Sequence, residues 1–470
     1  MHSDAPSSFP PTTVSGPWYR ELTRYHCFVL VVAALGWLFD TMDQQLFNLA
    51  RTPAIRELLG SEANDTLVAR QGAYATAIFI IGWATGGLVF GIMGDRVGRA
   101  KTMLLTILIY SLCTGLSAFS WDVWSFGAFR FLTGLGVGGE FAVGVALVAE
   151  VMPDIARPHA LGWLQTLSAV GNIAAALINI GLGIAEGEGA FAGTDWKPWR
   201  IMFVIGALPA LLAIAIRARL KEPERWQHAV AEGERRKAGS LAELFGDRRW
   251  RTNALIGLGL AIPGVVGLWG IGFFSFDFIR TVFRQSFEKE GLTPEEIRGK
   301  LTILVGVVSV LQNLGGAIGI YAFKRFTASS GRRPAFAIAF VLAILATAGT
   351  FWFLDSFYDV FWMIPVMGFC QLMLFGGYAI YFPELFPTRL RSTGTSFCYN
   401  VGRYVAALGT LTMGELIDTV FGGYCKATYG DQLGQIMAWR YTGVTMSLFF
   451  LIGLLVLPFA PETRDRPLPE

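Results

Sequence analysis

The chain has 470 residues, of which 53% are hydrophobic and 16% are charged, and its formal net charge is +3. A soluble protein of this length cannot bury so much apolar surface, so the composition predicts an integral membrane protein. The small net charge includes no basic block of the kind that forms a nucleic-acid-binding face. We therefore expect a lipid bilayer, and no nucleic acid, among its partners.

Twelve apolar runs follow one another along the chain, each close to the roughly 20 residues that a helix needs to cross a bilayer. They cover residues 27–50, 71–94, 102–120, 123–148, 160–185, 199–217, 252–284, 301–323, 334–354, 358–382, 392–421 and 438–460. The polar residues 1–26 lack the apolar core and cleavage site of a signal peptide, and predict an N-terminal tail. The predicted fold class is all-α integral membrane, with twelve transmembrane helices.

The basic residues predict how the chain is oriented, because Lys and Arg next to membrane spans are retained in the cytoplasm. A cytoplasmic N-terminus places 24 of the 38 Lys and Arg residues on the cytoplasmic side and 12 on the opposite side. The remaining two, Arg130 and Arg403, lie within predicted spans. We therefore expect a multi-pass protein of the inner or plasma membrane with both termini in the cytoplasm.

The two halves of the chain repeat at an offset of about 234 residues. AEVMPDIAR (149–157) and PELFPTRLR (383–391) share the spacing of Glu, Pro and Arg, and KEPERW (221–226) is echoed by PETR (461–464). We predict two six-helix pseudo-repeats in parallel, at 27–217 and 251–460, with a cytoplasmic linker at 218–250 and a C-terminal tail at 461–470. This is a transporter architecture in which the substrate binds between the halves.

Enzyme and metal chemistry find no support in the sequence. There is no Gly-x-Ser-x-Gly motif, the four histidines do not cluster, and the five cysteines form no disulfide or metal-binding pattern. We expect no enzymatic activity and no cofactor.

Several motifs carry a family resemblance that spans nearly the whole chain. GIMGDRVGRAK (91–101), RFLTGLGVGGE (130–140), EPERW (222–226) and PELFPTRLRSTG (383–394) resemble signatures of the major facilitator superfamily. Together they look like its sugar-porter-like and metabolite:proton symporter branches, and GGEFAVG (138–144) and FCYNVGR (397–403) resemble the sialate and lactate carriers. The resemblance implies alternating access, and gating by Asp95, Arg96, Arg99, Glu150, Glu384 and Arg391.

Two acidic residues lie three apart in the first span, in GWLFDTMD (36–43). Asp43 and Arg130 each lie about seven residues from the same membrane surface, and intramembrane charges usually pair, so we predict an Asp43–Arg130 pair. The resemblance implies a role of this pair in proton coupling. The alternative is a permanent ion pair that only ties the first span to the fourth.

Two other acids are candidates in proton coupling. Asp40 lies one turn from Asp43 on the same helix face, where it can relay the proton, bind the substrate or face water. Glu140, near the middle of the fourth span, is a candidate second proton carrier.

Arg403 and Asn400, in the eleventh span, are candidate ligands for the substrate and indicate its chemical class. A guanidinium near the midplane can bind a carboxylate with two parallel hydrogen bonds. The alternative is that Arg403 pairs with Glu140 or another acid. The sugar-porter Gln-Gln-x-x-Gly signature is replaced by PGVVG (263–267), and a signature Trp position is Ala379. These changes favour a small organic anion over a neutral sugar.

Four further residues are substrate-binding candidates. Gln165 and Asn172 match polar positions of sugar porters, and Tyr378 either lines the cavity or packs in the core. Asp277 repeats Asp43 at the offset of 234 residues, since GIGFFSFD (270–277) copies the spacing of GWLFDTMD.

The predicted function is proton-coupled symport of a small, monocarboxylate-like organic anion by alternating access. The anion, protons and lipid are the expected partners, and the expected functional unit is a monomer. The first alternative is a proton-coupled sugar or polyol symporter, and the second is a non-transporting sensor on the same scaffold.

Overall fold

The computed structural model describes residues 18–153, 156–191, 193–211, 213, 216, 220–222, 241–387 and 390–464. Within these ranges, the side chains of residues 18, 95–96, 141–142, 145–146, 149–150, 157–159, 161–169, 241, 328 and 391–392 are not described. The elements of the described ranges are all helical.

The N-terminal half contains six long or partly described helices. They are α1 (Arg24–Leu59), α2 (Asp65–Val97), α3 (Arg99–Ser117), α4 (Val123–Val151), α5 (Arg157–Gly187) and α6 (Pro198–Ile205), with short 3-10 turns at Trp18–Glu21 and Gly60–Glu62. Side-chain caps fix several starts: Thr23 accepts a hydrogen bond from the backbone N–H of His26, and Asp122 accepts one from Ser125.

The C-terminal half has more interruptions. Its helices are α9 (Leu241–Gly246), α10 (Arg248–Val265), α11 (Ser275–Lys289), α12 (Pro294–Ser330), α13 (Arg332–Phe353), α14 (Phe357–Glu384), α15 (Arg391–Glu415), α16 (Phe421–Tyr429), α17 (Asp431–Ser447) and α18 (Phe450–Val456). A π-helical segment η4 (Val266–Ile271) and a 3-10 segment η5 (Gly272–Phe274) join α10 to α11, and a second π-helical segment η6 (Leu416–Val420) joins α15 to α16. The 3-10 segment η7 (Leu457–Phe459) follows α18.

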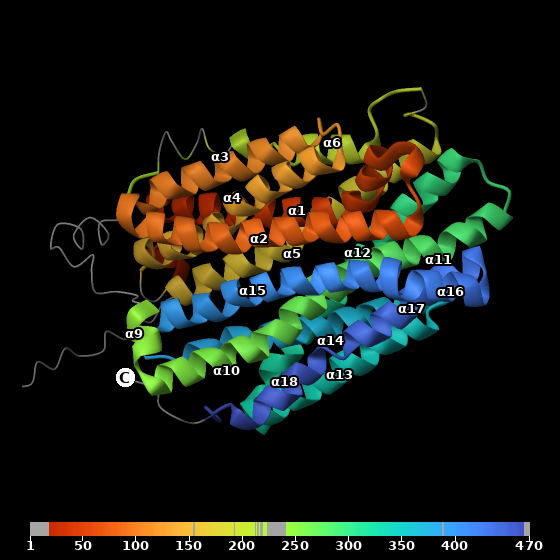
Figure 1. Cartoon of the computed structure of the whole chain (residues 1–470). Helices are drawn as coiled ribbons and strands as arrows, with labels where there is room; N and C mark the ends of the chain where they lie inside the picture. Colours follow the sequence, from red (N-terminus) through yellow and green to blue (C-terminus); the bar gives the residue numbers. More distant parts are fainter. Residues whose placement is uncertain are drawn as a thin grey trace, which may run out of the picture.

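The two halves lie side by side along one bundle axis (Figure 1). The first half runs from red to yellow and the second from green to blue, with α5 against α12 and α2 against α15 at the seam between them. We call the end where α1 and α10 begin the terminal end, and the end where α1 and α11 finish the distal end. The predicted all-α fold of two six-helix halves is confirmed.

Ten described segments are long and apolar enough to cross a membrane. They match ten of the twelve predicted spans, and α4 and α6 correspond to the fourth and sixth. Most helices extend beyond the predicted apolar run: α1 continues nine residues past residue 50, to Leu59. These extensions carry polar residues that fall outside an apolar run and belong to the same helix.

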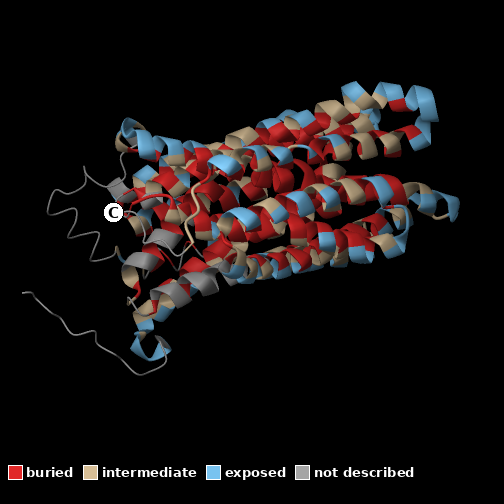
Figure 2. Ribbon diagram, turned by 90° about the horizontal axis from the view of Figure 1, so that it is seen from below, coloured by how far each residue is buried: buried red, intermediate tan, exposed pale blue. Residues whose placement is uncertain are grey.

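Burial is inverted relative to a soluble protein. Large apolar side chains such as Trp124, Leu455 and Phe459 are more than 70% exposed, whereas the charged side chains of Asp43 and Arg130 are fully buried. Figure 2 shows buried residues, in red, filling the interior along the length of the bundle. The outside thus suits lipid, and the polar chemistry lies within.

The sequence repeat has a structural counterpart at the terminal end. The Glu222 carboxylate accepts hydrogen bonds from the backbone N–H groups of Ala100 and Lys101, both at 3.1 Å, at the start of α3. The Glu462 carboxylate does the same for Arg332 and Arg333, both at 3.0 Å, at the start of α13. A carboxylate is favourable at a helix N-terminus, which explains the echo between KEPERW and PETR.

The glycine before each of these helices makes the contact possible. Gly98 and Gly331 have φ angles of +129° and +92°, which disfavour side chains. A Cβ on Gly98 would lie 2.3 Å from Oε1 of Glu222, and one on Gly331 would lie 3.0 Å from Oε2 of Glu462.

Replacement of Glu462 by glutamine will lower stability in a pH-dependent way. Burial opposes ionisation of Glu462, but the backbone N–H donors of Arg332, Arg333 and Arg464 outweigh it and hold its pKa below the usual value. Its charge therefore stabilises the fold fully above the ordinary glutamate pKa of about 4.3, and this contribution is lost as pH falls through the lower folded-state pKa. At neutral pH we expect a loss of about 0.5 kcal/mol, the size of a partly exposed charge–dipole interaction.

The measurement is the apparent melting temperature of purified protein in detergent as pH is lowered. Glu290→Gln is a matched control, because Glu290 pairs with Lys300 at an exposed position away from a helix N-terminus. A Glu462→Gln deficit that stays constant through acid pH contradicts the assignment.

Candidate functional site

Asp43 and Arg130 meet inside the N-terminal half, where α1 and α4 pack together. Nη1 of Arg130 lies 3.8 Å from Oδ1 of Asp43, and both side chains have zero exposure. The hydroxyl of Thr114, on α3, donates to the same Oδ1 at 2.7 Å. The Arg130 guanidinium also donates to Ser117 at 2.7 Å and to Thr133 at 3.0 Å. The structure thus brings together the pair that the sequence suggested.

The Asp43–Arg130 pair is close but incomplete. Within the described part of the chain, Oδ2 of Asp43 and Nη1 of Arg130 have no hydrogen-bond partner. The guanidinium lies 4.6 Å from the ring centre of Phe203 and 5.6 Å from that of Phe47, so aromatic faces supply much of its surroundings. One oxygen of Asp43 is therefore available to bind a proton.

Asp40 and Glu140 are two further buried carboxylates in the same half. Oδ2 of Asp40 accepts a hydrogen bond from Gln44 at 3.3 Å. Among the described residues, Oδ1 of Asp40 and both oxygens of Glu140 have no hydrogen-bond partner. A Cβ on Gly36 would lie 2.4 Å from Oε1 of Glu140, so the glycine makes space for that carboxylate against α1. Asp40 interacts electrostatically with Glu140, Asp43 and Arg403.

Arg403 lies on α15, with Asn400 one turn earlier. Nη1 of Arg403 donates to Oδ1 of Asn400 at 2.7 Å, and the guanidinium lies 4.2 Å from the ring centre of Trp83, on α2 of the other half. In the described ranges no carboxylate forms an ion pair with Arg403. The alternative pairing with Glu140 is therefore not the arrangement in this structure.

The Trp83 ring beside this arginine belongs to an aromatic cluster with members from both halves. The rings of Trp83 and Trp269 meet edge to face with their centres 5.1 Å apart, and Phe79 lies 6.1 Å from Trp269. Phe273 lies 4.9 Å from Trp269 on the C-terminal side of the seam. Sequence analysis missed this cluster, because tryptophans in apolar runs are not distinguishable from lipid-facing or core residues.

The other substrate-binding candidates have different positions. Asn172 of α5 donates to Asn313 of α12 at 2.9 Å, which links the two halves. The Tyr378 hydroxyl donates to the backbone oxygen of Leu260 at 2.7 Å, and its ring stacks within the C-terminal half, which is the core position given as its alternative. The side chain of Gln165 lies outside the described residues.

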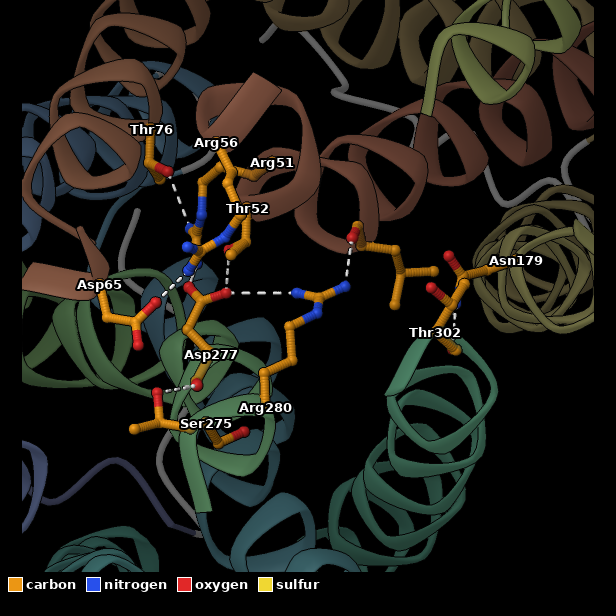
Figure 3. Close-up of polar contacts among 12 residues, drawn as sticks. Arg51, Thr52, Arg56, Asp65, Thr76, Asn179, Ser275, Asp277, Arg280 and Thr302 are labelled. Carbon is orange, nitrogen blue, oxygen red and sulfur yellow. Dashed lines mark hydrogen bonds and ion pairs between the residues drawn. The ribbon is translucent and has the colours of Figure 1, made fainter. Parts of the chain in front are cut away.

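Asp277 lies at the seam near the distal end, in contact with the other half (Figure 3). Its carboxylate accepts hydrogen bonds from Arg51 and Thr52 of α1 and from Arg280 of α11, the last at 3.3 Å. The repeat offers no basic residue near Ile364, the counterpart of Arg130, and Arg280 is the partner within the C-terminal half. Arg51, the partner from the other half, follows directly after the first apolar run and was not singled out.

The predicted gating residues are described in part. Glu384 pairs with Arg332 at 2.7 Å and also accepts a hydrogen bond from Thr463. Arg332 and Glu384 repeat the positions of Arg99 and Glu150 at offsets of 233 and 234 residues. The side chains of Asp95, Arg96, Glu150 and Arg391 lie outside the described residues.

Comparison with known proteins places this arrangement in context. The chain is 27% identical over 440 residues to a probable 4-methylmuconolactone transporter of Cupriavidus pinatubonensis, covering 89% of this chain and 92% of that protein. It is 26% identical over 445 residues to the sialic acid transporter NanX of Escherichia coli, covering 93% and 95% of the two proteins.

The fold also matches a solved structure. A D-xylose-proton symporter superposes with a TM-score of 0.67 at 18% identity, over 94% of this chain and 100% of that one. At this identity the likeness establishes the fold alone. The Major Facilitator Superfamily matches residues 33–410, which is most of the chain. The protein is therefore a membrane transporter of the Major Facilitator Superfamily, not an enzyme.

Proposed function

We propose that the protein is a proton-coupled symporter of a small organic anion that works by alternating access. In this proposal a monomer resides in the cell membrane, with the terminal end in the cytoplasm and the distal end outside. The excess of Lys and Arg in the segments at the terminal end supports this orientation. The names of the two relatives, a sialic acid transporter and a probable muconolactone transporter, support a small organic metabolite.

The main support for an anionic substrate comes from the residues that surround Arg403. Arg403 is partly buried, and a guanidinium that is withdrawn from water is costly unless it is paired. Among the described residues Arg403 contacts the neutral Asn400 and the Trp83 ring, and Asp40 interacts with it electrostatically without forming an ion pair. A substrate carboxylate would supply the missing charge, and the nearby tryptophans suit a flat or partly apolar body.

Three carboxylates are available for the proton. Asp43 has an arginine partner and a free oxygen, so it can alternate between an ion-paired and a protonated form during transport. Asp40 and Glu140 are the alternative carriers, because both are buried and each has an oxygen without a partner in the described region. The gating contacts at the terminal end, including Arg332 with Glu384, would open and close the cytoplasmic side.

A sugar or polyol symporter is the second candidate, favoured by the fold match to a xylose symporter. A sensor that does not transport is the third. Counterflow in proteoliposomes separates the sensor from both carriers, because a sensor exchanges nothing.

The test is uptake into proteoliposomes with an alkaline interior. We expect accumulation of N-acetylneuraminate or of the 4-methylmuconolactone carboxylate above the external concentration, and none of D-xylose. Collapse of the pH gradient by an uncoupler should abolish accumulation and leave equilibration intact. Accumulation of xylose alone would replace the proposal with the sugar carrier.

A further inference from the structure

Arginines and aspartates at the distal end form a cluster that spans the seam (Figure 3). Asp277 of α11 bonds to Arg51 of α1, and Asp65 of α2 bonds to Arg284 of α11 at 2.9 Å. Arg280 and Arg56 are the second partners of Asp277 and Asp65. We call these six residues the distal arginine cluster. Each of its carboxylates holds a helix of one half to a helix of the other.

The centre of the cluster is buried. Arg51 has zero exposure, Asp277 4% and Arg280 7%. The Arg51 guanidinium lies 4.0 Å from the ring centre of Phe274, and Nη2 of Arg280 donates to the backbone oxygen of Leu49 at 2.7 Å. A charge pair in such a setting is strong, and removal of one partner leaves the other charge buried and uncompensated.

The charges of the cluster do not balance. Four guanidinium groups share two carboxylates among the residues that the structure describes, and Nε of Arg51 has no acceptor there. A surplus of positive charge attracts anions where opening exposes it to solvent. Guanidinium groups in pairs also match the two oxygens of a carboxylate.

We propose that Arg51 and Arg280 form a carboxylate-binding site at the distal mouth, which Asp277 occupies as an internal ligand while the mouth is closed. When the halves part at this end, Arg51 of α1 separates from Asp277, which keeps Arg280 as its partner on α11, and Arg51 binds a carboxylate from solution. Exchange of one carboxylate for another keeps Arg51 paired, so opening avoids the cost of leaving its charge without a partner. The arriving anion then lies on the seam that leads to Arg403.

This site is separate from the one at Arg403. The claim that the captured anion is the transported one rests on the proposed function, including the outward orientation of the distal end. The claim that a free carboxylate replaces the Asp277 side chain does not, and it can be tested without transport or a known substrate.

The experiment is chemical rescue of Asp277→Ala with acetate, which has the size of the missing side chain. The reporter is Ser309→Cys in a variant without the five native cysteines. Ser309 has zero exposure and accepts a hydrogen bond from Gln45 across the seam at 2.7 Å. The reporter is labelled with a membrane-impermeant maleimide from the distal side.

We expect Asp277→Ala to increase the labelling rate about tenfold or more, because a buried charge pair that holds the closed state is lost. Added acetate should return the rate toward that of the parent, and acetamide should not. Asp355→Ala is the matched control: Asp355 pairs with Arg440 inside the C-terminal half, so its loss should leave labelling unchanged.

Two results overturn the proposal. Labelling of Asp277→Ala at the parental rate means that Asp277 does not hold the mouth closed. Equal effects of acetate and acetamide mean that no carboxylate site is present. If Asp277→Ala does not fold, as judged by size-exclusion profile, Asp277→Ser serves, because its short side chain also leaves room for acetate, with the same rise in labelling and the same discrimination between the two solutes. Failure of transport assays with every acid would leave these results intact and would reject only the proposed function.

Discussion

Arg403→Lys will weaken carboxylate binding although it keeps the positive charge. An ammonium group cannot donate two parallel hydrogen bonds and also hold Asn400 while it stacks on Trp83, as the guanidinium does. We expect a loss of about 1–3 kcal/mol, the range for a charge-assisted hydrogen bond, which is roughly five- to 150-fold in Kd. The measurement is equilibrium binding of the best carboxylate from the uptake screen to purified protein.

Two controls separate anchoring from general damage. The neutral amide of the same acid should bind poorly to the parent protein and lose little in the variant. In the double variant Arg403→Gln with Glu140→Gln, carboxylate affinity should stay low, because Glu140 is not the partner of Arg403 in this structure. Recovery of affinity in the double variant would show that Arg403 only neutralises Glu140, and would favour the sugar carrier.

Asp43→Asn will abolish accumulation driven by a pH gradient while counterflow continues. Exchange of labelled for unlabelled substrate needs alternating access but no net proton movement, so a carrier without its proton site still exchanges. Asparagine keeps the size of the side chain and can still accept the hydrogen bond of Thr114. Paired measurements of accumulation and counterflow in the same proteoliposomes report the two functions separately.

Asp40→Asn is the matched comparison, one turn away on α1 and equally buried. If Asp43→Asn still concentrates substrate and Asp40→Asn does not, the proton site moves to Asp40. Loss of both accumulation and counterflow in Asp43→Asn would instead indicate a structural tie between α1 and α4, which is the alternative interpretation of the Asp43–Arg130 contact.

The sequence predicted the features that a bilayer dictates. A span needs about 20 apolar residues, so the runs marked the helices, and charges inside the runs marked Asp43 and Arg130 by their common depth. Equal depth in the membrane is enough to predict a pair within one half, because neighbouring spans of a bundle already lie side by side.

Contacts across the seam were not predictable in the same way. Arg51 and Asp277 belong to different halves, and their meeting depends on how the two bundles pack in this state. Asn172 was chosen for its match to a sugar-porter position, yet it bonds to Asn313 of the opposite half. The α1 helix also continues through a polar sequence to Leu59, so Arg51 and Arg56 lay beyond any apolar signal.

The segment between α10 and α11 has a mechanical consequence. Over residues 266–274 the chain forms first a π-helical and then a 3-10 segment, so the regular α-helical hydrogen bonding of the seventh crossing is interrupted. Interruptions of this kind often mark hinges, because the helix can bend there while fewer regular α-helical backbone hydrogen bonds are broken. The α11 helix, with 15 residues and both Asp277 and Arg280, can thus tilt as a short lever while α10 stays packed. A tilt of α11 on this hinge would carry Asp277 and Arg280 together away from Arg51 of the other half.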